Sequence, residues 1–253
     1  MNVMQTKTLK LNHELENMET RFLIEAIRER YGYDLAGYNQ EILRKELIKC
    51  SRKIKQKSLG ALQDRILRDE TLIDPLLEQL FFKSNEESFL PRLFKTQMRK
   101  KVLPMLKTYP KVKVWHLGCS DEALTLLFVS LLKEAELLDR TQIYATEMSE
   151  NATENARSHY SKSKFKKYAH AISFFPYNFL SDSSFNEFQL ILMSTRMADL
   201  DLITKDRVMG LIHDSSSRLG FLYCPEKNLF KESTLKNQYK ILDDKLGLFQ
   251  RRV

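Results

Sequence analysis

The chain has 253 residues, a length that suits one large domain or two smaller ones. Hydrophobic residues make up 43% of it, and it contains only 7 Gly and 6 Pro, which predicts a helix-rich fold with a sizeable core. There is no run of ~18 apolar residues and no apolar stretch near the N-terminus, so we expect neither a membrane span nor a secretory signal.

Charge and cysteine content narrow the class of protein further. The net charge of +8 fits an anionic partner such as nucleic acid, an acidic protein or an acidic membrane face, although a modest excess also simply keeps a protein soluble. Cys50, Cys119 and Cys224 are odd in number, and no pair has the spacing of metal ligands. We therefore expect a reduced, cytoplasmic protein without a metal site.

The first third of the chain has a helical pattern. Residues 1–17 are polar and predict a frayed leader, whereas 18–88 show apolar residues at helical spacing and predict a small all-helical domain. Turns are expected at Gly32, Ser58-Leu59-Gly60 and Asp69-Glu70. Residues 89–107 predict a connecting helix that is interrupted near Pro91 and Pro104.

The pattern changes to alternating strands and helices over 108–253. Strands are expected in VKVWHLG, QIYATE, AISFFP, FQLILMS and LGFLYC, with helices over 121–137, 149–160 and 201–213 and a hairpin at the end. The stretch 112–160 reads as strand, Gly-containing turn, helix and a second strand ending in an acid, as in a nucleotide-binding half. The predicted fold class is therefore α/β, with a Rossmann-like domain after the helical one.

The chain resembles the CheR chemotaxis receptor methyltransferases over nearly all of its length. The stretches that carry the resemblance are LFFKSNEESFLPRL, WHLGCSDEALTLLFVSLLKE, YATEMSENATENARSHY and FQLILMS, in the family's order. The resemblance implies a methyltransferase-type domain that uses S-adenosylmethionine to methylate glutamate side chains on receptor helices. The family's small β-subdomain would fall at 160–171, where only twelve residues (YSKSKFKKYAHA) stand, so we expect it to be missing or much reduced.

Three residues match cofactor-binding positions of the family. Gly118 stands at the position of the first glycine in the family's loop. Glu147 occupies the place of the acid that would hydrogen-bond the ribose, but it could also be a solvated acid near the start of a helix. Asn178 matches a family Asn, and it could equally be a turn residue. If these residues retain the site, the resemblance implies that S-adenosylmethionine or S-adenosylhomocysteine binds there.

Other positions depart from the family. Glu122 replaces the second glycine of the loop and brings bulk and negative charge near the methionine carboxylate, and Ala123 replaces the acid that follows. The remaining departures are Leu77 and Gln79 upstream of the F-F-R motif, Lys83 for its Arg, Ser194-Thr195 for Arg-Asn, and Asp199 for Tyr. Lysine keeps the positive charge of Arg but lacks the planar guanidinium group that can donate two parallel hydrogen bonds. We therefore assign no catalytic residue and expect an eroded site.

A basic helix is the feature most similar to a family docking surface. Its cations are Arg44, Lys45, Lys49, Arg52 and Lys53, several of them at helical spacing. The resemblance implies docking on an acidic receptor or signalling helix bundle, and the alternative is a solvated face. A second group of cations could form another basic patch or simply lie on a loop; it consists of Lys162, Lys164, Lys166 and Lys167.

Two functions remain open, with a third less supported. The first is a CheR-like protein with an eroded site that regulates or scaffolds a signalling complex without efficient methyl transfer. The alternative is an active S-adenosylmethionine-dependent protein-glutamate O-methyltransferase that acts on a chemoreceptor-like substrate. Nucleic-acid binding through the basic helix has the least support, because no basic motif interleaved with aromatic residues accompanies that helix.

Overall fold

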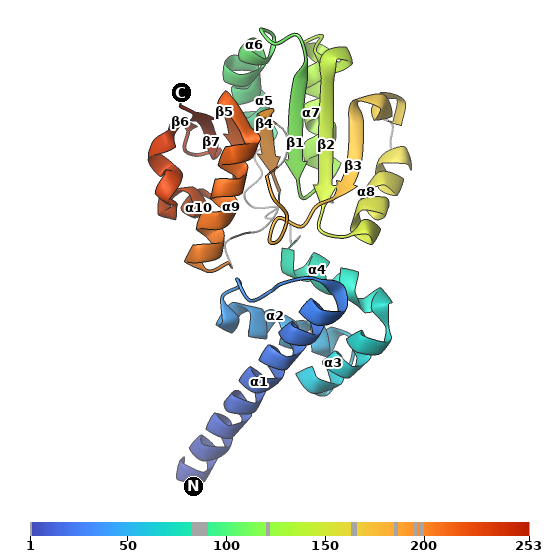
Figure 1. Ribbon diagram of the computed structural model, residues 1–253, viewed down its shortest axis with the longest axis vertical. Helices are drawn as coiled ribbons and strands as arrows, with labels where there is room; N and C mark the ends of the chain where they lie inside the picture. Colours follow the sequence, from blue (N-terminus) through green and yellow to red (C-terminus); the bar gives the residue numbers. More distant parts are fainter. Residues whose placement is uncertain are drawn as a thin grey trace. The chain divides into compact units, whose positions relative to one another are not determined.

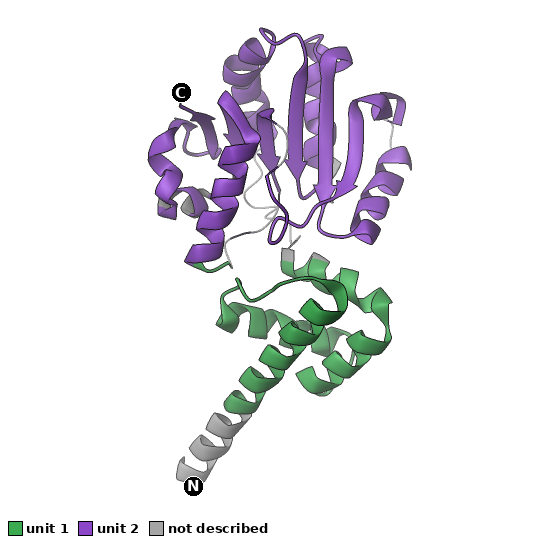
Figure 2. Ribbon diagram, viewed as in Figure 1, with its two compact units in different colours: residues 1–80, 199–201 green, residues 81–198, 202–253 purple. Residues whose placement is uncertain are grey.

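The computed structural model describes residues 2–81, 91–119, 122–162, 166–184, 187–194, 197 and 200–252. These fall into two compact units, shown in Figure 2. Unit 1 contains residues 1–80 together with 199–201, and unit 2 contains the rest. None of the helices in the described ranges is long and apolar enough to cross a membrane.

Unit 1 is helical. Its elements are α1 (Asn2–Tyr31), α2 (Gln40–Lys53), α3 (Leu59–Arg68), η1 (Glu70–Leu72) and α4 (Ile73–Phe81). Gly32, with φ of +77°, ends α1, and the side chains of Asn39 and Ser58 accept backbone N–H bonds at the starts of α2 and α3. The turn predicted at Gly32 is confirmed, whereas of the turn predicted at Ser58-Leu59-Gly60 only Ser58 precedes the helix, since Leu59 and Gly60 belong to α3.

Helix α1 is longer than the sequence pattern suggested. It begins at Asn2, whereas a polar leader was expected over 1–17. No Gly or Pro interrupts this stretch, so the backbone can continue the helix even where few apolar residues mark a buried face. Further along, Leu23 and Ile27 of α1 are fully buried and contribute to the core of unit 1.

Unit 2 contains a sheet with helices packed on it (Figure 1). Its first elements are α5 (Pro91–Gln97), a π-helical turn η2 (Met98–Val102), α6 (Leu103–Leu106), β1 (Val112–Leu117), α7 (Glu122–Glu134), η3 (Leu138–Arg140), β2 (Thr141–Glu147) and α8 (Glu150–Lys162). They are followed by η4 (Lys166–Ala171), β3 (Ile172–Pro176), β4 (Phe188–Met193), α9 (Leu202–Ser215), β5 (Ser216–Tyr223), α10 (Lys227–Glu232), η5 (Thr234–Gln238), β6 (Tyr239–Asp243) and β7 (Leu248–Arg251).

The seven strands have the order β3-β2-β1-β4-β5-β7-β6. The first five run parallel, and β7 pairs antiparallel with both β5 and β6. The predicted α/β class, the Rossmann-like sheet and the C-terminal hairpin are confirmed. The chain order of the strands reverses between β1 and β4, which makes their carboxyl ends the expected ligand-binding edge of such a sheet.

Both faces of strand β1 are covered by apolar side chains, which come from different parts of unit 2 on each face. On one face, Val114 and Ile143 pack in a core with Phe128 of α7. On the other, the ring of Trp115 lies 5.0 Å from that of Tyr177 and 5.4 Å from that of Phe188. The largely apolar run VKVWHL of β1 is consistent with this two-sided burial.

Two connections bear on the family comparison. Between α8 and β3, the described residues form η4 and no strand, in agreement with a reduced β-subdomain. The connecting helix predicted over 89–107 is not broken at Pro104; a π-helical turn leads into α6, and Pro104 stands in its first turn. Proline is tolerated there because the first N–H groups of a helix have no partner within it.

Candidate functional site

The turn after β1 keeps the geometry of a glycine loop. Gly118 has a φ of +83°, a conformation that side chains disfavour. Its N–H and that of Cys119 donate to the carbonyl oxygen of Thr146, at 2.9 and 3.2 Å, so the turn is tied to the end of β2. This places Gly118 at the predicted ligand-binding edge.

His116 is a buried polar residue at this edge, and sequence reasoning missed it. Its Nδ1 lies 2.6 Å from Oγ1 of Thr125 on α7, and its Nε2 lies 2.8 Å from Oγ of Ser194, just after β4. Burial lowers the pKa of His116 to about 3, so the ring is neutral, with one nitrogen donating and the other accepting. The residue thus links β1, α7 and the end of β4 across the strand-order reversal.

Glu147 ends β2 but does not face solvent. Only 1% of its surface is exposed, so it is not the solvated acid considered as an alternative. Its carboxylate contacts the thiol of Cys119, which is also buried. Burial first, and then the nearby Glu147 carboxylate, raise the pKa of that thiol well above its usual value. Glu147 therefore interacts with a neighbouring protein group, and its predicted contact with ribose stays a prediction.

Asn178 is part of a turn. Its Oδ1 accepts the N–H of Leu180 at 3.1 Å, and its own N–H donates to Asp182 at 2.8 Å. The backbone carbonyl oxygen of Asn178 also accepts a hydrogen bond from the N–H of Asp182, at 2.7 Å. These bonds favour the turn interpretation, because Asn side chains that bond the backbone two residues on stabilise such turns.

The other predicted site residues within the described ranges belong to α4 in unit 1 and α7 in unit 2. Leu77 is buried and Gln79 is half-buried, both on α4, while Ala123 is exposed in the first turn of α7. Glu122 begins α7, but its side chain is outside what the structure describes. Lys83, Thr195 and Asp199 lie outside the described residues, so their placement in a site stays a prediction.

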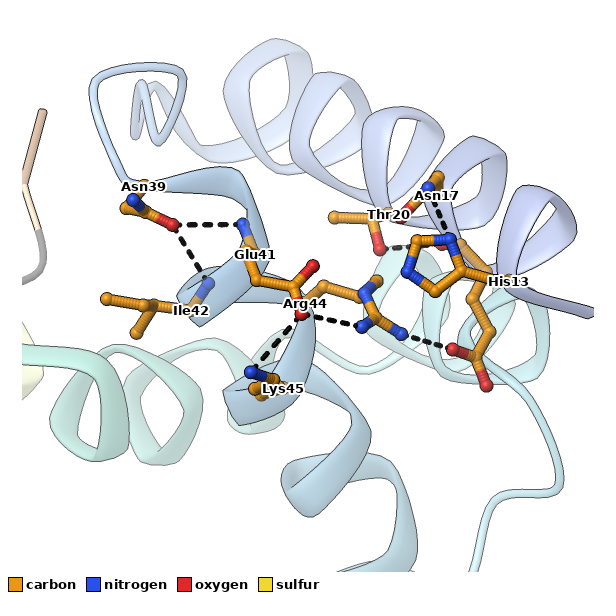
Figure 3. A network of polar contacts seen from close by, with 9 residues as sticks. His13, Asn17, Thr20, Asn39, Glu41, Ile42, Arg44 and Lys45 are labelled. Carbon is orange, nitrogen blue, oxygen red and sulfur yellow. Dashed lines mark hydrogen bonds and ion pairs between the residues drawn. The ribbon is translucent and has the colours of Figure 1, made fainter. Parts of the chain in front are cut away.

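The basic helix α2 needs one correction. Arg44 does not belong to an exposed face, because only 10% of its side chain is exposed and it pairs with Glu16 of α1 and with Glu41. Figure 3 shows Arg44 and Lys45 around Glu41. Hydrogen bonds from Arg44 and then Lys45 lower the pKa of Glu41. The cations that do lie exposed on α2 are Lys45, Lys49, Arg52 and Lys53.

Arg44 is therefore expected to matter for stability. Replacing Arg44 with Met should destabilise unit 1 by about 1–2 kcal/mol, because the hydrogen bonds of its guanidinium group to Glu16 and Glu41 are lost. Urea unfolding followed by circular dichroism would measure this. Lys53→Met, an exposed neighbour on the same helix, should change stability by less than about 0.5 kcal/mol, and equal losses for the two variants would contradict the assignment.

No family model matches the chain. The sequence is 27% identical over 266 aligned residues to a Pseudomonas putida protein named "Putative methyltransferase Cher3", covering 93% of this chain and 97% of that one. The similarity spans both units. It agrees with the methyltransferase-type fold of unit 2.

Several solved structures were found to be similar to this chain at low sequence identity. StiE O-MT residues 961-1257 are 15% identical with a TM-score of 0.40, covering 60% of this chain and 52% of that one. Magnesium protoporphyrin IX methyltransferase (ChlM) from Synechocystis PCC 6803, solved with bound SAM, is 12% identical with a TM-score of 0.40, covering 64% and 81%. This chain spans about half the length of the first of these structures.

Proposed function

We propose that this chain is a CheR-like protein whose S-adenosylmethionine site has eroded, and that it works as a binding protein in a signalling complex. The order of its motifs and its similarity to the Pseudomonas putida protein along both units support the CheR-like part of the proposal. The departures at Glu122, Ala123 and Ser194 support the loss of cofactor binding.

One observation carries the proposal: polar side chains at the carboxyl ends of the strands already have partners within the protein. Ser194 bonds His116, Glu147 contacts Cys119, and Asn178 bonds its own turn. A ligand that used these groups would first have to break these bonds, each of which contributes about 0.5–1.5 kcal/mol to stability. The described residues at the predicted positions therefore fit the cofactor poorly.

A methyl-transfer assay tests the catalytic part. Purified protein is mixed with S-adenosylmethionine carrying a labelled methyl group and with a receptor-like helical peptide rich in glutamate. We expect no label in the peptide above a sample without enzyme. Time-dependent, stoichiometric labelling of the peptide would contradict the proposal. The label should then be present as glutamate methyl esters, from which mild base releases the methyl group as methanol.

That outcome would favour the second candidate, an active protein-glutamate O-methyltransferase. The specific observation for it is the retained glycine turn, with Gly118 at a φ of +83° next to an acid that ends β2. If S-adenosylmethionine binds, Gly118 would let the backbone approach it and Glu147 would turn toward the ribose hydroxyls. The cofactor would supply the activated methyl group.

The exposed cations of α2 are expected to speed association with an acidic protein partner. Changing Lys49, Arg52 and Lys53 together to Glu should slow association with an acidic helix bundle by about tenfold or more at low salt. The effect should shrink as salt rises, since exposed charges are screened over about 8–10 Å. A biosensor series at several ionic strengths would measure both.

A matched control changes Lys111, Lys236 and Lys240 to Glu, which alters net charge equally on exposed positions of unit 2. If the control slows association as much as the α2 variant, net charge alone is responsible. In that case the α2 face is solvated and is not a docking surface.

A further inference from the structure

Helix α1 of unit 1 has apolar side chains on two separate faces. One face packs within the unit, where α1 contacts α2 and α3 (Figure 1). On that face Leu23 and Ile27 are fully buried, and Oε2 of Glu19 accepts the N–H of Leu59 at the start of α3, at 3.2 Å. The fold of unit 1 therefore accounts for this face of the helix.

The second face of α1 is exposed. Leu15, Met18 and Phe22 have 55%, 44% and 57% of their surface exposed. At 100° per residue they fall in a stripe about 60° wide, whose centre lies roughly 130° around the helix from Leu23 and Ile27. The fold of unit 1 does not account for a continuous apolar stripe on this second face, which is the mark of a surface that packs on a partner.

The spacing of the stripe is that of a coiled-coil seam. Leu15, Met18 and Phe22 are separated by three and then four residues, like the a, d and a positions of a heptad. The preceding d, a and d positions are occupied in the sequence of α1 by Leu11, Thr8 and Met4. A repeat sustained in this way favours another helix as the partner.

The charges beside the stripe favour a second copy of α1 in antiparallel orientation. Glu14 and Arg21 are both exposed, and they occupy the g positions on one edge of the stripe. In an antiparallel pair this edge meets the same edge of the other helix. The layer that joins Leu15 to Met18 of the second copy then brings Glu14 beside Arg21 of that copy, twice by symmetry. In a parallel pair Glu14 would instead meet Glu19 of the second copy, and like charges there repel.

A membrane surface fits this face less well than a second helix does. Helices that lie on membranes carry mainly Lys and Arg beside their apolar face. Here Glu14, Glu25 and Glu29 border the stripe as well as Arg21 and Arg28, and Arg28 pairs with Glu25 at 2.5 Å. The acids would be repelled by the anionic lipids that attract such helices.

We propose that two copies of this chain associate through α1 as a short antiparallel coiled coil. Leu15 of each copy packs against Met18 of the other, Phe22 meets the next position of the repeat, which is Leu11, and Glu14 pairs with Arg21. The proposal goes beyond the proposed function and does not rest on it, because this face contains none of the predicted cofactor-site residues.

Analytical ultracentrifugation of the full chain, between about 1 and 200 μM, tests the proposal. We expect the weight-average mass to rise from the 29.8 kDa of one chain toward twice that value, with a dissociation constant on the order of 10 μM. Leu15→Glu combined with Phe22→Glu should raise this constant by about thirtyfold or more, because the new carboxylates would be buried in the seam. Both positions are exposed within the chain, so the variant should keep its fold, which circular dichroism would verify.

Two further sets of variants test the face and the orientation. Leu202→Glu combined with Ile203→Glu, an equal change at exposed apolar positions of α9, should leave association unchanged. Glu14→Arg and Arg21→Glu should each raise the dissociation constant by about threefold to tenfold. Combined in one chain they should restore it, because the exchange only swaps the two members of each ion pair.

Four results would overturn the proposal. The first is a chain that stays monomeric up to about 200 μM. The second is association that the α9 control weakens as much as the Leu15 and Phe22 variant does. The third is tighter association of Glu14→Arg alone, which would indicate a parallel pair. The fourth is a monomeric chain that sediments with vesicles of phosphatidylcholine and phosphatidylserine through Leu15 and Phe22, since the stripe would then be a membrane-binding face.

Discussion

Acidification from about pH 6.5 to about pH 4.5 is expected to cost unit 2 roughly 2–3 kcal/mol of stability through His116 alone. In the folded chain, burial lowers the pKa of this ring from 6.5 to about 3. The unfolded chain therefore takes up a proton as the pH falls through 6.5, whereas the folded chain does not until about pH 3. Stability that is fully present above pH 6.5 is thus lost between these values, by up to about 1.4 kcal/mol per pH unit.

Urea unfolding at several pH values, with His116→Asn as the comparison, isolates this contribution. Asn does not titrate, so the variant should lose less stability over the same range, although at neutral pH it should be less stable by about 1–3 kcal/mol because Thr125 and Ser194 lose their partner. Carboxylates elsewhere contribute equally to both proteins. Parallel pH dependences for the two would show that His116 is not a buried neutral ring.

Restoring the family's residues is expected to lower the dissociation constant for the cofactor by about a hundredfold, if the old pocket can still open. The variant combines Glu122→Gly, Ala123→Glu, Ser194→Arg and Thr195→Asn. The first change removes bulk and like charge, the second supplies an acceptor for the methionine ammonium, and the last two restore polar groups after β4. Single changes should do little, because contacts within one site are coupled.

The structure adds two requirements to this experiment. Ser194→Arg breaks the bond to His116, so circular dichroism must first show that the quadruple variant folds. A fifth change, Glu147→Gln, should then abolish most of the recovered binding if that carboxylate turns to the ribose. A folded quadruple variant without calorimetric heat would mean that the protein's own side chains keep the pocket closed.

The fold was largely predictable because periodicity is a local property. Apolar runs such as VKVWHL and FQLILM become buried parallel strands, and Gly32 marks the end of α1. The placement of β7 between β5 and β6 could not be deduced, since strand order depends on which edges meet in space. The helical continuation through 2–17 was missed because it lacks the apolar pattern on which the prediction depended.

The site was less predictable because side-chain partners come from distant parts of the sequence. Arg44 appears in a basic run at helical spacing, yet its partner Glu16 lies on another helix and holds it away from solvent. His116 gave one weak signal, a lone polar ring within an apolar strand, and only the structure brings Thr125 and Ser194 to it. Glu147 matched a family motif, but its burial against Cys119 could not be inferred from spacing.

The central claim is that the strand ends of unit 2 no longer accept the cofactor. Calorimetric titration of the unmodified chain with S-adenosylhomocysteine tests this most directly, because it needs neither the substrate nor turnover. With about 50 μM protein and ligand to about 1 mM, we predict no heat beyond dilution. A saturable isotherm with a dissociation constant of about 10 μM or tighter would contradict the account, since it would require Ser194, Glu147 and Asn178 to leave their present partners for the ligand.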